Sequence, residues 1–164
     1  MEMKTDEKWW ISRGKKDILE LAFILSKNAL VLWDNYNFSD KSEVRLNLIK
    51  SLPGDALQEI AEGINNVKNE FNKDKINKLF TLFVTPVLQI RDGELKLPYI
   101  VKSAFLSVFD ILKGILSMRN KSQALQCFSS SITRSLDAIK ISHIMTSNEL
   151  SLLTKKYLLL SDIN

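Results

Sequence analysis

Apolar side chains recur at steps of three and four residues along most of the chain, the spacing that gathers side chains on one face of an α-helix. The pattern first appears between residues 15 and 36 and returns in the later segments up to residue 157. No segment shows the strict alternation of apolar and polar residues that is typical of a half-buried strand, and no internal repeat is evident. The pattern therefore predicts an all-α fold.

Turn-forming residues divide this pattern into six or seven helices of one compact bundle. Pro53-Gly54 is expected to separate a short helix ending near Leu52 from a longer helix over residues 55–71, because proline disfavours helical geometry in the residue before it. Pro86 is expected to kink or end the following helix. The expected breaks lie near 37–40, 52–54, 91–97 and 144–147.

Two segments carry further signals of their place in the bundle. The helix that begins after Pro98 and runs to about residue 116 has the widest apolar face, so we expect it to be the central, most buried helix. Thr146 precedes Glu149 by three residues, which is the spacing of a capping box. This pair predicts the start of the last helix.

Acidic side chains line the polar face of the helix predicted over residues 55–71. They recur opposite the apolar face, and no lysine or arginine is interleaved at the fourth position. Like charges at this spacing repel by roughly 0.2–0.5 kcal/mol per pair. These residues form either a solvated face or a surface that meets a basic partner; the candidate partner-binding residues are Asp55, Glu59, Glu62 and Glu70.

Two adjacent tryptophans, Trp9 and Trp10, are the second candidate contact. Neighbouring side chains on a helix point about 100° apart, so both rings can hardly enter one core. They either clamp the N-terminal segment to the body or contribute to an interface, where tryptophan is enriched. We expect a single helical domain over residues 1–164, with residues 1–12 as a loosely attached segment.

Residue types that carry out chemistry are scarce. The chain contains one histidine, one cysteine and five glycines, and it has no glycine-rich loop. His143 has no partner for a metal site and no nucleophile to serve, so we interpret it as a core or capping residue. Cys127 belongs to no CxxC pair and has no basic residue nearby, which indicates a small packed side chain. We expect no catalytic residue, cofactor or metal site, and hence no enzymatic activity.

Charge and composition fit a cytoplasmic protein. A single cysteine excludes an intramolecular disulfide, and neither a secretory signal nor a membrane-spanning stretch is expected. Residues 1–93 hold 14 basic and 14 acidic side chains, whereas residues 94–164 hold nine basic and five acidic ones and carry the net charge of +4. The basic residues are scattered rather than concentrated, which does not favour nucleic-acid binding.

In size and make-up, the whole chain resembles the immunity proteins of bacterial polymorphic and contact-dependent toxin systems. The resemblance implies a non-catalytic inhibitor that covers the active or substrate-binding surface of a toxin domain, such as a nuclease. Immunity proteins against basic nucleases are often acidic, whereas this chain is net basic. Either its recognition would be local, through the acidic residues from Asp55 to Glu70, or the toxin would not be a basic nuclease. The alternative is a helical nucleic-acid-associated regulator, which only the basic excess in residues 94–164 favours.

Overall fold

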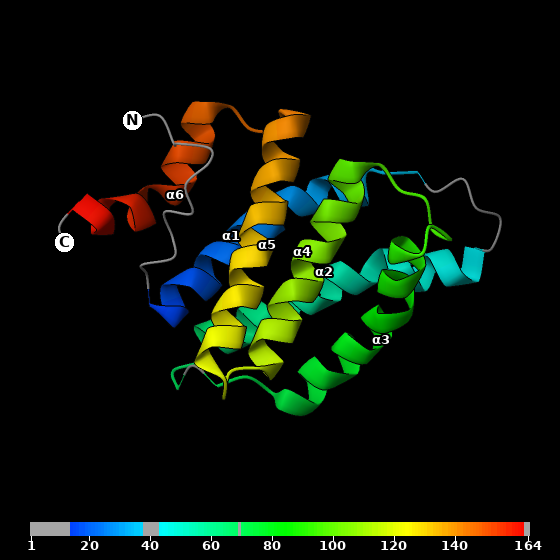
Figure 1. The fold of residues 1–164 in the computed structure, drawn as a ribbon, viewed down its shortest axis with the longest axis horizontal. Coiled ribbons are helices and arrows are strands. Elements are labelled where there is room, and N and C mark those ends of the chain that lie inside the picture. Colours follow the sequence, from blue (N-terminus) through cyan, green and yellow to red (C-terminus); the bar gives the residue numbers. More distant parts are fainter. Residues whose placement is uncertain (1–13, 38–42, 69, 163–164) are drawn as a thin grey trace.

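The computed structural model describes residues 14–37, 43–68 and 70–162, and their side chains except at 43–48 and 156–162. All regular structure within these residues is helical, and the helices pack into one compact bundle (Figure 1), which confirms the predicted class. The expected breaks at 91–97 and 144–147 are also confirmed. The six helices are α1 (Lys15–Asp34), α2 (Glu43–Asn65), α3 (Lys73–Arg91), α4 (Tyr99–Leu116), α5 (Lys121–Ser142) and α6 (Ser147–Asp162).

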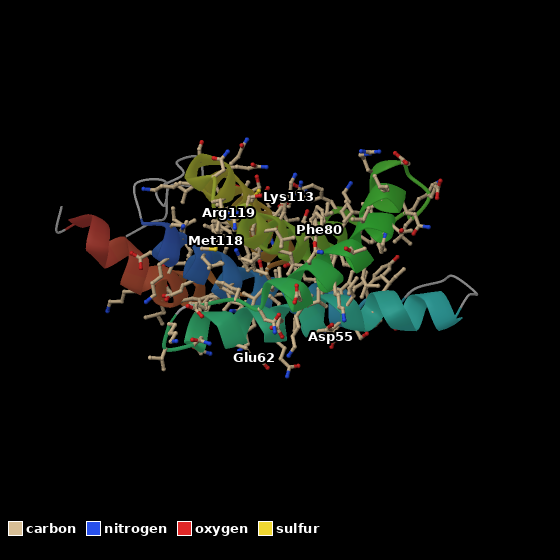
Figure 2. All side chains as sticks on the ribbon, turned by 90° about the horizontal axis from the view of Figure 1, so that it is seen from below. Asp55, Glu62, Phe80, Lys113, Met118 and Arg119 are labelled. Atoms are coloured by element: carbon tan, nitrogen blue, oxygen red, sulfur yellow. The ribbon has the colours of Figure 1, made fainter. Side chains whose placement is uncertain are left out.

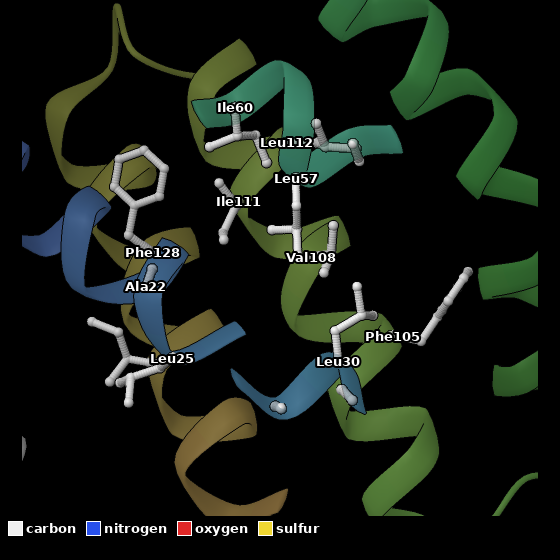
Figure 3. Packing of buried hydrophobic residues seen from close by; sticks show 14 of the residues in the cluster. Ala22, Leu25, Leu30, Leu57, Ile60, Phe105, Val108, Ile111, Leu112 and Phe128 are labelled. Atoms are coloured by element: carbon white, nitrogen blue, oxygen red, sulfur yellow. The ribbon is translucent and has the colours of Figure 1, made fainter. Parts of the chain in front are cut away.

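Helix α4 lies at the centre of the bundle, as its wide apolar face predicted. It packs against α1, α2, α3 and α5, and 11 of its 18 residues are buried. The ring centroid of Phe105 lies 4.5 Å from that of Trp33 and 4.8 Å from that of Phe83, so one aromatic group joins α1, α3 and α4. Figure 3 shows Val108 and Ile111 beside apolar side chains of α1 and α2. The core is therefore continuous across these helices.

Small residues allow α1, α4 and α5 to pack closely. The hydroxyl oxygens of Ser26 on α1 and Ser131 on α5 are 3.1 Å apart and fully buried. On α4, a Cβ added at Gly114 would lie 2.4 Å from the Phe128 ring of α5. The ring thus lies directly against the α4 backbone. We call these three helices the α1–α4–α5 layer.

The predicted helix break at Pro53-Gly54 is wrong, because α2 runs through it without interruption. Proline removes one helical N–H and crowds the preceding turn, which leaves carbonyls in need of donors. The carbonyl that Pro53 leaves without its helical donor is that of Ile49, four residues earlier. The Trp33 indole Nε1 donates to the neighbouring carbonyl, that of Lys50, at 3.0 Å. The Lys50 ammonium donates in return to the carbonyls of Trp33 and Tyr36 at the end of α1, at 2.6 and 2.8 Å. Contacts with α1 therefore override the local signal.

The predicted continuation of that helix to residue 71 is also wrong, because α2 ends at Asn65. Val67 lies beyond the helix end and is 99% exposed. The Asn66 side chain accepts a hydrogen bond from the backbone two residues on, at 2.9 Å, a local turn that competes with the helix. Phe71 folds back over α2, and a Cβ at Gly63 would lie only 2.1 Å from its ring.

Helix α3 likewise continues past Pro86, which does not end it. Pro86 and Phe83 are buried on the face that meets the core. One turn earlier, Phe80 stacks on Phe109 of α4 with ring centroids 5.2 Å apart. Burial of these side chains offsets the missing backbone bond. The cap predicted for the last helix is confirmed, since the Thr146 hydroxyl accepts a hydrogen bond from the backbone N–H three residues on, at 3.1 Å.

Candidate functional site

Three of the four predicted acidic residues lie on α2. Asp55 and Glu62 are exposed and Glu59 is half-buried; Figure 2 shows Asp55 and Glu62 on the side of α2 that faces away from the bundle. None of the three carboxylates forms an ion pair with a described side chain. Glu70 is exposed in the segment between α2 and α3, so it does not share this helical face. We call Asp55, Glu59 and Glu62 the acidic row.

A groove of about 290 Å³ lies between α2 and α3. Its walls are mainly apolar, and hydroxyl and amide groups of α3 border it. Leu82 is 61% exposed, which shows that the groove is open to solvent. The lining residues are Ile49 and Leu52 from α2, and Thr81, Leu82, Thr85, Pro86 and Gln89 from α3.

The groove and the acidic row adjoin on α2. Leu52, Asp55 and Glu59 are separated by three and four residues, so they follow one side of the helix. Leu52 forms part of the groove wall, and the two carboxylates continue the same line toward the end of α2. We call the groove and the acidic row together the α2–α3 surface.

A mostly buried ion pair joins α4 and α5. The Nε atom of Arg134 donates to Oδ2 of Asp110 at 2.9 Å, and the two side chains are 42% and 13% exposed. Burial raises the pKa of the Asp110 carboxyl to about 6, although the charges of Arg134 and Lys113 oppose this shift. Sequence reasoning missed this pair. The available signal was a lone aspartate inside the apolar run 108–112.

Cys127 lies close to this ion pair and is buried, which confirms its interpretation as a packed side chain. The prediction that no basic residue is near it is wrong, because α4 brings Lys113 close enough to lower the pKa of the thiol. Burial has the larger effect and raises that pKa, and the charge of Asp110 adds to the rise. The thiol is therefore protonated near neutral pH, which makes it a poor nucleophile.

His143 caps the C-terminal end of α5. The residue is exposed and has a left-handed backbone conformation (φ 57°). Its backbone N–H donates to the Ile139 carbonyl at 3.1 Å. The capping interpretation is thus confirmed, and the core interpretation is wrong.

The second candidate contact, Trp9 and Trp10, lies outside the described residues. Within those residues, no three His, Cys, Asp or Glu side chains are placed to hold a metal ion, and no helix is both long and apolar enough to cross a membrane.

No family model matches the chain, and neither does any curated protein or solved structure. Function is therefore inferred from the chemistry of the described surfaces. The α2–α3 surface combines an open apolar groove with a row of negatively charged carboxylates. Protein interfaces commonly have an apolar centre and a polar rim, with charge complementary to the partner.

Proposed function

We propose that this protein is a non-catalytic inhibitor that binds a basic protein through the α2–α3 surface. The supporting observation is the position of the groove beside the acidic row, since Leu52, Asp55 and Glu59 follow one side of α2. The complementary partner surface carries lysine or arginine side chains around an apolar side chain. That side chain would enter the groove between α2 and α3.

The two parts of the surface act at different stages of binding. Carboxylates of one sign create a negative potential, which accelerates encounter with a basic surface by one or more orders of magnitude at low salt. The groove acts after encounter, because an apolar side chain buried in it slows dissociation. Leu82, which is largely exposed in the free protein, would be covered in the complex.

The finer proposal is that the partner is a bacterial toxin domain and that the protein acts as its immunity protein. The size and make-up of the chain support this through the resemblance described above. A nuclease toxin carries cations that contact nucleic-acid phosphates, and a protein that covers those cations blocks the substrate without any chemistry of its own. The net charge of +4 requires that attraction arises locally, at the acidic row.

The test begins with the gene directly upstream, which we expect to encode a secreted protein with a toxin-like C-terminal domain; that domain is the partner to be measured. Its association rate with the wild-type chain and with the double variant Glu59→Lys/Glu62→Lys is measured by stopped-flow fluorescence at low and high salt. We expect the double reversal to slow association about tenfold at low salt, with a smaller effect at high salt because salt screens the field.

The matched control is Glu94→Lys/Glu149→Lys, which changes the net charge equally at exposed positions outside the α2–α3 surface. It should slow association much less. Equal rates for the two double variants would contradict the assignment of the acidic row. Duplex DNA or RNA binding that depends on the basic side chains of residues 94–164, without any protein partner, would support the nucleic-acid-associated alternative instead.

A further inference from the structure

A second cavity, of about 220 Å³, lies where the start of α1 meets the end of α2 and the turn after α4. Figure 2 shows Met118, one of its lining residues, beside the start of α1 and apart from Asp55 on α2. Its lining residues are Lys15, Lys16, Leu19, Glu20, Gly63, Ile64, Phe71 and Met118. None of these belongs to the α2–α3 surface. We call this the α1–α2 cavity.

The inner walls of the α1–α2 cavity are apolar. Leu19 is buried, and Ile64, Phe71 and Met118 are half-buried around the opening. The Phe71 ring rests on the α2 backbone at Gly63, where an added Cβ would lie 2.1 Å from the ring. The absence of a side chain at Gly63 therefore sets the position of one wall.

The charged groups at the cavity are mainly basic. Two lysines, Lys15 and Lys16, line it against one carboxylate, that of Glu20. Neither lysine forms an ion pair within the described part of the chain. Both stand in the first turn of α1, where the helix dipole disfavours a positive charge. A bound anion would relieve this unfavourable placement.

We propose that the α1–α2 cavity binds a small carboxylate with an apolar tail. Its volume exceeds that of an engineered apolar cavity of about 150 Å³ that binds benzene, so an aromatic ring or a short alkyl chain fits inside. The tail lies against Leu19, Phe71 and Met118, and the carboxylate faces the ammonium groups of Lys15 and Lys16. This site is independent of the inhibitor function proposed above.

The experiment titrates the full chain with hydrocinnamate, which combines a phenyl ring with a carboxylate, and follows binding by isothermal calorimetry. Hydrocinnamamide has the same shape without the charge, and acetate has the charge without the ring. We expect saturable binding of hydrocinnamate, affinity roughly fivefold lower for the amide, and no measurable binding of acetate. Equal affinity for the acid and the amide would overturn the assignment of the lysines.

Two variants locate the site. In Lys15→Gln/Lys16→Gln, the preference for the acid over the amide should disappear, whereas the matched variant Lys73→Gln/Lys75→Gln, at the start of α3, should keep it. Gly63→Ala should displace the Phe71 ring and weaken both ligands at least tenfold; circular dichroism checks that this variant is folded. Met118→Trp, which fills the cavity instead, should have the same effect.

Three further results would overturn the proposal. The first is an equal loss of preference in the α3 control, and the second is unchanged binding in both cavity variants. The third is binding that appears only after Trp9→Ala and Trp10→Ala, because this would assign the cavity to the N-terminal segment of the chain itself.

Discussion

The α1–α4–α5 layer and the α2–α3 pair are packed in different ways. In the layer, Ser26 bonds Ser131 and the Phe128 ring covers Gly114, so helix backbones approach closely. Helices α2 and α3 each contain an internal proline and leave a groove of about 290 Å³ between them. Dense packing favours one arrangement of the chain, whereas an open groove leaves apolar surface for a partner. The two regions thus differ in how much apolar surface they leave open, and under the function proposed above the α2–α3 pair is the part that meets the partner.

The largest expected difference in the free energy of unfolding is between a variant of a core residue in the layer and a variant of a groove residue. Phe105→Ala should lower the free energy of unfolding by about 3–5 kcal/mol, because it empties the centre of the aromatic group. Leu82→Ala should change it by less than about 0.5 kcal/mol, since that side chain is mostly exposed. Urea denaturation of both variants measures this difference; similar losses would break the comparison.

The next effect is a pH dependence that originates in the layer. The Asp110 carboxyl has a folded-state pKa of about 6 against an ordinary value of 3.8, so its ionisation costs folding free energy. Its contribution to stability is therefore greatest below pH 3.8 and falls as the pH rises to about 6. Asp110→Asn removes this dependence. The free energy of unfolding of the variant, relative to that of wild type, should therefore increase by about 2–3 kcal/mol as the pH rises from about 4 to about 7. Parallel stability curves for the two proteins would contradict the burial of this charge.

A smaller effect tests the hydrogen bonds by which Lys50 of α2 contacts the end of α1. Lys50→Met keeps the apolar stem but removes the ammonium bonds to the carbonyls of Trp33 and Tyr36. We expect a loss of about 1–2 kcal/mol in urea denaturation. Lys27→Met, at an exposed position on α1, is the control and should stay within about 0.5 kcal/mol of wild type. Equal losses would mean that these bonds do not hold α2 to α1.

The smallest expected effect concerns the acidic row. Glu59→Lys/Glu62→Lys should leave the free energy of unfolding within about 0.5 kcal/mol of wild type. The row makes no ion pair with described side chains. In addition, Glu62 is near the end of α2, where the helix dipole favours a cation. Thermal denaturation beside the association measurement separates stability from binding. A loss above about 2 kcal/mol would assign the row a structural role.

The same contrast explains which features could be predicted from the sequence. Helices α4 and α5 have ends marked by local chemistry: Pro98 precedes α4, the Asn120 side chain caps the amide of Gln123 at 3.2 Å, and His143 closes α5. Sequence reasoning placed both ends of α4 and the break after α5 to within one or two residues.

Features that depend on contacts between helices were missed or misplaced. Nothing near Pro53 reveals that the Trp33 indole will satisfy the Lys50 carbonyl, and nothing near Glu70 reveals that Phe71 folds back over Gly63. The groove and the ion pair between Asp110 and Arg134 exist only once neighbouring helices are packed. Asp55, Glu59 and Glu62 share a face because they stay within one helix.

The contact between Ser26 and Ser131 has a consequence for the order of events during synthesis. The two residues are 105 positions apart, so α1 leaves the ribosome long before the helix against which it packs. At ordinary elongation rates this interval is roughly 5–20 s, far longer than the microseconds a helix needs to form. During that time the apolar residues of α1 have only the nearer helices to cover them. The contact between α1 and α5 thus forms only after α5 has been translated, and we expect slower elongation to lengthen the time for which α1 is incompletely covered.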